Sequence, residues 1–180
     1  MPSVFGHLLA SSTMGCVFFP KEVDRRALLI AGLCAVIPDA DIVAFSLGIP
    51  YESPWGHRGW THSLVFAVFL GSSAGWLFYR RQRYWLRMAL WFILAVASHP
   101  LLDMLTTGGL GCALLWPFSA ERLFFPVRVI RVSPLEAGAF FSTWGLKVLL
   151  SEGVWIGLPA AGLILARFFW MKIRDGFAKK

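Results

Sequence analysis

Histidines are the residues of this 180-residue sequence best suited to chemistry, because a neutral imidazole can bind a metal ion or accept a proton near neutral pH. The sequence contains four of them: His7, His57, His62 and His99. His99 lies four residues before Asp103, so both side chains lie on one face of a helix and could bind one metal ion. A buried hydrogen bond between the two is an equally good interpretation of that spacing alone.

Two aspartates follow a proline in the run Pro38-Asp39-Ala40-Asp41. Residues i and i+2 do not share a face of a helix, so one carboxylate can bind a metal while the other positions a ligand or accepts a proton. We expect Asp41 to bind the metal and Asp39 to be the catalytic proton acceptor. The alternative is a solvated helix end, in which neither aspartate has a chemical role.

The most distinctive motif is His57-Arg58-Gly59-Trp60-Thr61-His62-Ser63, just before an apolar run. We expect His62 to bind the metal and His57 to take part in catalysis, although the motif leaves open which of the two is the ligand. The planar guanidinium of Arg58 could bind a phosphate or carboxylate group of a substrate during catalysis. The alternatives are histidines exposed in a polar loop and an arginine that anchors the chain at a membrane interface.

The predicted metal site therefore combines two histidines and two aspartates: His62, His99, Asp41 and Asp103. Nitrogen and oxygen donors of these types favour Zn²⁺, with Mn²⁺ or iron as alternatives. A metal ion with an open coordination position lowers the pKa of its water toward about 7 and so supplies a nucleophile for hydrolysis. The sequence has neither a Gly-rich phosphate loop nor the GxSxG motif of serine hydrolases.

The elements that hold these residues are predicted to be membrane helices. Hydrophobic residues make up 57% of the chain and charged residues 15%, whereas soluble domains carry about 25% charged residues. Five apolar segments approach the roughly 20 residues that span a bilayer: residues 4–19, 27–49, 63–79, 86–105 and 144–169. We predict one all-α domain over residues 1–180 with five transmembrane or membrane-embedded helices, kinked at Pro38 and Pro100.

The basic residues predict an orientation in the membrane. Of the 17 lysines and arginines, most lie between the first and second segments, between the third and fourth, and in the C-terminal tail. The positive-inside rule places these regions and the C-terminus in the cytoplasm. All four histidines, with Asp39, Asp41 and Asp103, then lie at the external face, which is periplasmic in a Gram-negative bacterium. The net charge of +7 comes from short clusters between apolar runs, so we expect no nucleic-acid partner.

The loop of residues 106–142 is long for so small a chain, and long loops in compact domains are usually functional. We expect it to form an interfacial lid with a short hairpin or strand. Trp116 would lie at the level of the lipid headgroups. Three arginines could bind the anionic headgroup of a lipid substrate: Arg122, Arg128 and Arg131. An ordinary aromatic and basic belt at the interface is the alternative.

The early histidine His7 and the motifs at residues 38–41, 57–63, 98–103 and 116–119 together resemble the YdjM family. The resemblance covers about residues 1–142. That family consists of bacterial inner-membrane proteins described as LexA-regulated, membrane-bound, metal-dependent hydrolases. It is in turn similar to zinc-dependent phospholipases C and single-strand nucleases, which are helical enzymes that cleave phosphoesters.

The resemblance to these phosphoesterases implies a set of zinc ligands. One zinc ion would be held by the four residues that match their pattern: Asp41, His62, His99 and Asp103. His7 would match an early histidine that binds another zinc ion in those enzymes. No histidine follows Asp103 here, whereas those enzymes use later histidines and a glutamate for further metals. We therefore expect one metal ion and no full trinuclear cluster; a second ion held by His7, His57 or Asp39 is the alternative.

The function expected from residues and resemblance is that of a metal-dependent hydrolase of the bacterial inner membrane, similar to a phospholipase C. It would cleave an ester or phosphoester of a lipid or lipid-linked substrate at the external face. One alternative is a non-enzymatic membrane protein with a structural metal site. The other is a metal transporter or sensor, which would need a path of polar residues through the membrane that the apolar segments do not show.

Overall fold

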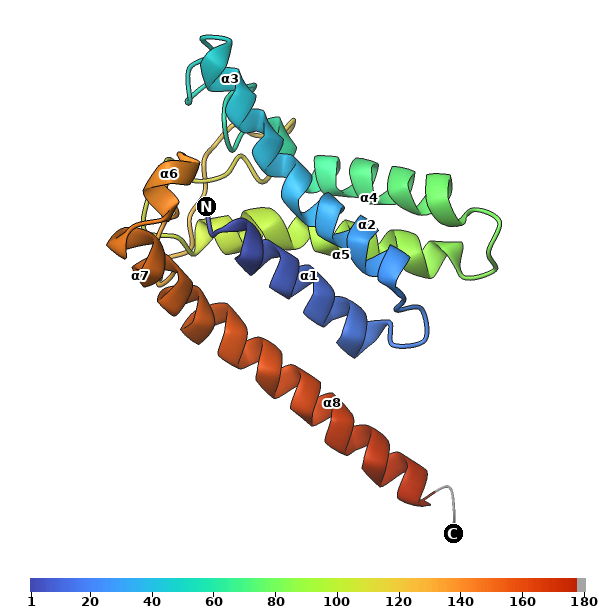
Figure 1. Cartoon of the computed structure of the whole chain (residues 1–180). Coiled ribbons are helices and arrows are strands. Elements are labelled where there is room, and N and C mark those ends of the chain that lie inside the picture. Colours follow the sequence, from blue (N-terminus) through green and yellow to red (C-terminus); the bar gives the residue numbers. More distant parts are fainter. Residues whose placement is uncertain (178–180) are drawn as a thin grey trace.

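The computed structural model describes residues 1–177, and within that range it is helical and has no strand (Figure 1). Four long helices pack against one another as an up-and-down bundle. They are α1 (Val4–Phe18), α2 (Arg25–Val36), α4 (Leu64–Tyr79) and α5 (Trp85–Met104). The predicted all-α architecture is therefore confirmed, and three of these helices begin and end within two residues of the predicted segments.

Small residues let these helices approach closely, as is common where helices pack inside a membrane. A Cβ atom added to Gly71 of α4 would lie 2.3 Å from the backbone nitrogen of Ile93 in α5. One added to Gly15 of α1 would lie 2.1 Å from the ring of Trp91. The indole of Trp91 is fully buried and donates a hydrogen bond to the Ser11 carbonyl at 3.1 Å, which ties α5 to α1.

The second predicted segment changes its helical form at Pro38. The α-helix α2 ends at Val36, a 3₁₀ helix η1 (Ile37–Ile42) follows, and a single turn α3 (Val43–Ser46) completes the run. Proline has no N–H and its ring crowds the preceding turn, so the α-helical hydrogen bonds cannot continue unchanged through Pro38. The predicted kink at this proline is the place where the two aspartates of the motif are presented.

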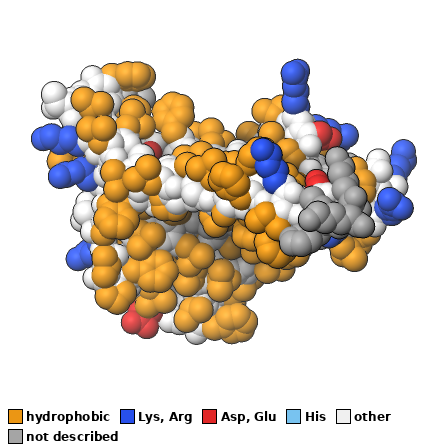
Figure 2. All heavy atoms as spheres, turned by 90° about the horizontal axis from the view of Figure 1, so that it is seen from below, with side chains coloured by type: hydrophobic (Ala, Val, Ile, Leu, Met, Phe, Trp, Pro, Cys, Tyr) orange, Lys and Arg blue, Asp and Glu red, His pale blue; other side chains and the backbone are white. Residues whose placement is uncertain are grey.

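The last apolar segment forms one continuous helical rod that leaves the bundle (Figure 1). It consists of α7 (Thr143–Glu152), a π-helical turn η3 (Gly153–Gly157) and α8 (Leu158–Phe177). Three helical runs are long and apolar enough to cross a membrane: Arg25–Ser46, Trp85–Met104 and Thr143–Asp175. Helices α1 and α4 are apolar but shorter. Figure 2 shows one face of the molecule, which is largely hydrophobic with basic side chains near its edges.

The loop after α5 is less regular than predicted. Among residues 1–177, only two isolated β-bridges occur, Thr106 with Ile130 and Cys112 with Leu123, so the prediction of a hairpin or strand is wrong. Residues 127–132, in which apolar and basic side chains alternate, instead complete the end of α5, because the N–H groups of Val129 and Ile130 donate to the Leu105 carbonyl at 2.9 and 3.1 Å. A short helix α6 (Ala137–Phe140) precedes α7.

Candidate metal centre

The candidate site lies at one end of the bundle because of its up-and-down topology. The start of α1, the end of α2, the start of α4 and the end of α5 all meet there (Figure 1). Four residues from three segments each offer a metal-ligand atom, and these atoms lie within 4.8 Å of one another. They are Asp39 of η1, His62 of the 3₁₀ turn η2 (Trp60–His62), and His99 and Asp103 of α5. We call them the four-residue group.

A backbone carbonyl of α2 orients His99. The Nδ1 atom of His99 lies 2.7 Å from the carbonyl oxygen of Ala35, in the last turn of α2, where helix carbonyls lack partners within the helix. A carbonyl can only accept a hydrogen bond, so Nδ1 carries the proton and Nε2 of the neutral ring presents its lone pair to the site. The change to a 3₁₀ helix after Val36 thus frees the acceptor that fixes this imidazole.

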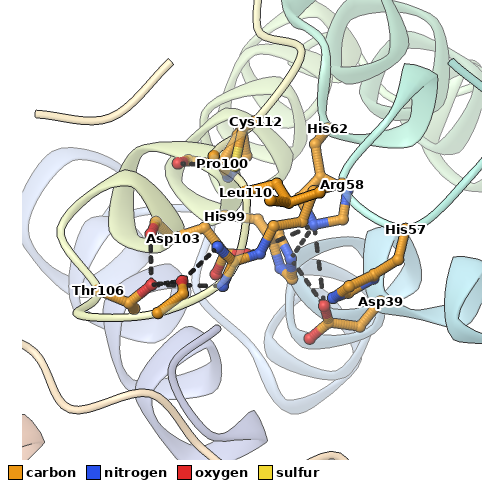
Figure 3. Close-up of polar contacts among 12 residues, drawn as sticks. Asp39, His57, Arg58, His62, His99, Pro100, Asp103, Thr106, Leu110 and Cys112 are labelled. Carbon is orange, nitrogen blue, oxygen red and sulfur yellow. Dashed lines mark hydrogen bonds and ion pairs between the residues drawn. The ribbon is translucent and has the colours of Figure 1, made fainter. Parts of the chain in front are cut away.

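His62 faces His99 across the site. It is the last residue of η2 and directly precedes Ser63, the N-cap of α4. The Ser63 hydroxyl accepts the Phe66 N–H at 3.0 Å as an N-cap. His62 Nδ1 lies 3.2 Å from Asp41 Oδ2, and its Nε2 lies 3.1 Å from the Nε2 of His99 (Figure 3). Burial lowers the pKa of His62, but hydrogen bonds with the carboxylates of Asp103 and Asp41 outweigh it and raise the pKa to about 9. The space between the two Nε2 atoms is therefore a position for a proton or a metal cation.

The two carboxylates of the group are buried and have few partners. Among residues 1–177, no hydrogen bond satisfies an oxygen of Asp39 or of Asp103; Asp39 Oδ1 lies 3.2 Å from His99 Nε2, and Asp103 Oδ2 forms an ion pair with Arg58 Nε at 2.9 Å. Buried carboxylates without hydrogen bonds are costly, and a divalent cation would supply positive charge to both at once. Tetrahedral Zn²⁺ with Zn–N bonds of about 2.0–2.1 Å separates two nitrogens by about 3.3 Å. The four residues therefore fit a zinc ion in donor type, and the two imidazole nitrogens, 3.1 Å apart, also fit it in spacing.

The two aspartates of the motif differ from expectation. The sequence favours Asp41 as the ligand, but the structure places Asp39 in the four-residue group and Asp41 outside it. Asp41 accepts hydrogen bonds from the Arg58 N–H at 3.0 Å and from the Thr61 hydroxyl, and its Oδ1 lies 2.6 Å from Nδ1 of His57. In a 3₁₀ helix of three residues per turn, residues i and i+2 point to different sides. One therefore faces α5 and the other faces the loop of residues 57–61.

Arg58 also differs from expectation, because its guanidinium is occupied. Its Nε lies 2.9 Å from Asp103 Oδ2, and its Nη atoms donate to the Gly108 carbonyl at 3.0 Å and to the Thr106 hydroxyl at 3.3 Å. The side chain is buried and the backbone φ is +60°, a conformation that L-residues seldom adopt. Arg58 thus balances the charge of a group member, and the structure does not present it as an open receptor for an anion.

His7 lies beside the four-residue group without belonging to it. Its ring stacks on that of His99 with centroids 3.8 Å apart, and its Nε2 lies 3.6 Å from Asp103 Oδ1. His7 is fully buried, and neither of its ring nitrogens has a hydrogen-bond partner. The early histidine therefore does reach the site, on the side of Asp103 that faces α1.

The aromatic and basic residues of the loop expected to form a lid, residues 106–142, mostly contact other loop residues. Arg122 donates to the carbonyls of Tyr51, Ser53 and His57 at 2.6, 2.9 and 2.8 Å, so it clamps a loop instead of offering its charge to a headgroup. Trp116 packs against Trp55 and Trp60. The other two arginines lie over aromatic rings outside the group: Arg128 over Phe124 and Arg131 over Trp144.

Sequence reasoning missed three polar residues that shape the site. Thr61 and Thr106 hold Asp41 and Arg58 in place through their hydroxyls. Glu152 is buried at the end of α7, where it accepts hydrogen bonds from the N–H and hydroxyl of Ser3 at the start of α1. The signal for Glu152 was available, because an isolated acid inside an apolar segment is costly and is seldom without a role.

Fold and site together define a helical membrane protein that buries a carboxylate–imidazole group at one end of its bundle. The chain matches the model of the family described as YdjM inner membrane protein over residues 1–174, and it belongs to that family. The match extends the expected resemblance from residue 142 almost to the C-terminus.

Two relatives from Escherichia coli K12 are similar to this chain. Inner membrane protein YbcI is 38% identical over 186 residues, which cover 97% of this chain and 100% of the relative. Inner membrane protein YdjM is 33% identical over 135 residues, which cover 62% of this chain and 64% of the relative. The protein of the same name from Shigella flexneri has the same identity and coverage. No solved structure matches the chain. The relatives and the apolar helices support the expected location in the inner membrane.

Proposed function

We propose that this protein is a metal-dependent hydrolase of the bacterial inner membrane. The proposed substrate is a lipid or lipid-linked molecule, and the bond cleaved is an ester or phosphoester. The observation that carries the proposal is the pair of imidazole Nε2 atoms 3.1 Å apart, next to two buried carboxylates, of which only that of Asp103 has a guanidinium partner. A proton between the nitrogens would satisfy one pair of atoms only, whereas a divalent cation would satisfy all four residues.

The four-residue group would hold the cation: Asp39, His62, His99 and Asp103. Two nitrogen and two carboxylate donors favour Zn²⁺, with Mn²⁺ or iron as alternatives. When bound, such an ion lowers the pKa of water toward about 7 and polarises a carbonyl or phosphoryl oxygen. His7, stacked on His99 and near the free oxygen of Asp103, would bind the same ion from the side or a second ion beside it.

The remaining polar residues would orient the ligands and move protons. The Asp41 carboxylate and the Ala35 carbonyl fix which nitrogen of His62 and of His99 faces the ion. Asp41 also lies 2.6 Å from Nδ1 of His57, an arrangement that leaves Nε2 of His57 as the acceptor. We therefore assign His57 the proton-transfer role that the sequence had suggested for Asp39. Arg58 would offset the negative charge of Asp103.

The membrane setting supports a lipid substrate and an external site. The four-residue group lies at the bundle end opposite the α1–α2 and α4–α5 connections, which carry basic clusters (Figure 1). By the positive-inside rule, those connections face the cytoplasm and the site faces the periplasm. A site at that depth meets lipid headgroups directly.

A structural metal site is the second candidate, and one observation favours it. Each member of the group is at most 8% exposed, and four protein ligands can complete a tetrahedral zinc site without water. The two candidates differ in whether a water molecule reaches the metal. X-ray absorption spectra of the zinc form, or optical spectra after replacement by Co²⁺, would separate four protein ligands from three or four plus water.

The first experiment is elemental analysis of the tag-free protein purified in detergent. We expect about one equivalent of zinc, manganese or iron in the wild type and none in the variant carrying His99→Ala and Asp103→Ala. Asp175→Asn, an exposed aspartate of α8, is the matched control and should keep its metal. A metal-free wild type, even after reloading, would refute the proposal.

The second experiment tests hydrolysis. The metal-loaded protein is incubated with phospholipids, lysophospholipids and lipid phosphates, and the products are resolved by mass spectrometry. We expect cleavage that needs the metal and is lost in His57→Ala, which removes the proposed proton acceptor but leaves the four-residue group unchanged. If the metal-loaded protein cleaves none of these lipids, the structural-metal candidate takes precedence.

A further inference from the structure

A hollow of about 380 Å³ lies beside the candidate site, between the η1–α3 run and the start of α4. Its volume falls within the roughly 300–1,000 Å³ of small-molecule pockets. Most of its lining is aliphatic or aromatic, including Ile37, Val43 and Leu47 on one side and Trp55, Trp60 and Phe66 on the other. Its lining contains no lysine or arginine, so an anionic ligand finds no counter-charge there.

The polar end of the hollow leads to the candidate site. Only Asp41 and Thr61 contribute acidic or hydroxyl groups to the lining. Thr61 donates to Asp41, and Asp41 Oδ2 lies 3.2 Å from Nδ1 of His62, whose other nitrogen belongs to the four-residue group. An occupant of the hollow therefore ends one imidazole ring away from the proposed metal.

The hollow also has an exposed apolar rim. Val43 and Ala44 lie near the end of a helical run long and apolar enough to cross a bilayer, Arg25–Ser46. Val43 is 55% exposed and Leu47 is 69% exposed, so the rim is apolar and open in a membrane protein. Two tryptophans line the other side, and tryptophan is enriched where hydrocarbon meets the headgroups. The carboxylate of Asp41 already interacts with four donor groups, so it does not call for a cationic ligand.

We infer that this hollow binds the hydrocarbon chain of a lipid substrate, which enters sideways from the bilayer and brings its headgroup linkage to Asp41 and Thr61, one imidazole ring from the four-residue group. The inference rests on the proposed function for what happens to that lipid, but binding of the chain can be tested without turnover. The hollow would bring a lipid as far as Asp41 and Thr61, beside a site whose own residues are buried, without passage of the chain through water.

Photo-crosslinking tests the inference directly. The full chain is reconstituted in nanodiscs of phosphatidylethanolamine and phosphatidylglycerol that contain phosphatidylglycerol with a diazirine in its acyl chain. Val43→Trp fills the rim of the hollow. Val68→Trp is the matched control, because Val68 is 53% exposed on α4 and does not line the hollow. Labelled peptides are quantified by mass spectrometry after irradiation.

We expect labelling in the wild type to concentrate in residues 37–49 and 55–66, to fall severalfold in Val43→Trp, and to persist in Val68→Trp. Leu47→Trp, at a second exposed rim position, repeats the test if Val43→Trp does not fold. Labelling spread evenly over the lipid-facing helices, or unchanged by both rim variants, overturns the inference. So does protection of the rim by a second copy of the chain, detected as crosslinked dimers without lipid label.

Metal content separates failure of this inference from failure of the proposed function. If the protein binds its metal and cleaves lipid but shows no focused label, the proposed function stands and the inference about the hollow is wrong. If the protein binds no metal but still concentrates the label in the hollow, the inference about lipid binding stands and the proposed hydrolase function is wrong.

Discussion

Asp41→Asn should weaken metal binding without abolishing it, whereas Asp39→Asn should remove most of it. The reason is that Asp39 belongs to the four-residue group, while Asp41 contacts only one member of that group, His62, at the nitrogen that faces away from the proposed metal. The pair of variants distinguishes the arrangement in the structure from the one that the sequence favours, in which Asp41 is the ligand.

The size of the Asp41→Asn effect follows from its contacts. An asparagine keeps one acceptor oxygen, which can still serve the Arg58 N–H and the Nδ1 of His62, while its amide NH₂ turns toward His57. The bond to His62 then changes from charge-assisted, about 1.5–3 kcal/mol, to neutral, about 0.5–1.5 kcal/mol. A loss of about 1.4 kcal/mol is about tenfold in affinity. That value lies at the lower end of the roughly 10–100-fold range for residues that orient metal ligands.

The assay is a competition between the tag-free protein and a chromophoric zinc chelator in detergent. Thermal unfolding of each variant without metal serves as the control, because replacing a buried carboxylate can change stability independently of metal binding. If Asp41→Asn loses affinity as severely as Asp39→Asn at equal metal-free stability, the assignment of the two aspartates is wrong.

Three further predictions follow from the same contacts. Apparent zinc affinity should rise about tenfold per pH unit up to about pH 9 and then level off. The reason is that, below its raised pKa, His62 holds a proton that the metal must displace. The chelator competition at several pH values measures this slope. Glu152→Ala should lower stability by about 2–3 kcal/mol, because the buried N–H and hydroxyl of Ser3 lose their acceptor; unfolding in detergent would show it, and an unchanged midpoint would contradict it. Arg122→Ala should speed the loss of metal to EDTA by about tenfold, because three carbonyl contacts in the loop before the site are released. Arg128→Ala is the control and should leave this rate unchanged, because the Arg128 side chain lies over the ring of Phe124.

The bundle was predictable because its signal is local. An apolar run of about 20 residues between breaks is sufficient to define a membrane helix, and the segments at 63–79 and 86–105 begin and end within one residue of α4 and α5. The pairing of His99 with Asp103 was local too, since a spacing of four residues fixes their common face. The gathering of the histidines at one end followed from alternating helix directions.

The partners of the polar side chains were not predictable in the same way. Asp39, and not Asp41, lies in the four-residue group because the chain changes to 3₁₀ geometry there and because the loop with His57 and Arg58 packs against Asp41. Arg58 and Arg122 were expected to be free for substrate, but each is bound to groups about 50 to 70 residues away in the chain. Such contacts depend on how two loops meet, and a single sequence carries no local signal for them.

The contacts of Arg58 and Arg122 also make access to the site and its charge balance interdependent. Segment 106–123 lies against the loop of residues 51–58 through Arg122, through the Ala113 N–H donating to the Arg58 carbonyl at 3.0 Å, and through the Arg58 guanidinium at Gly108. Lifting that segment would therefore pull Arg58 from Asp103 and leave a buried carboxylate without its cation, which is costly unless a metal ion is present. We therefore expect segment 106–123 to stay in place over a metal-free site and to lift more easily once a metal ion is bound. Sideways entry of a lipid through the hollow would leave the contact between Arg58 and Asp103 in place. We therefore expect this route to cost less free energy than lifting segment 106–123.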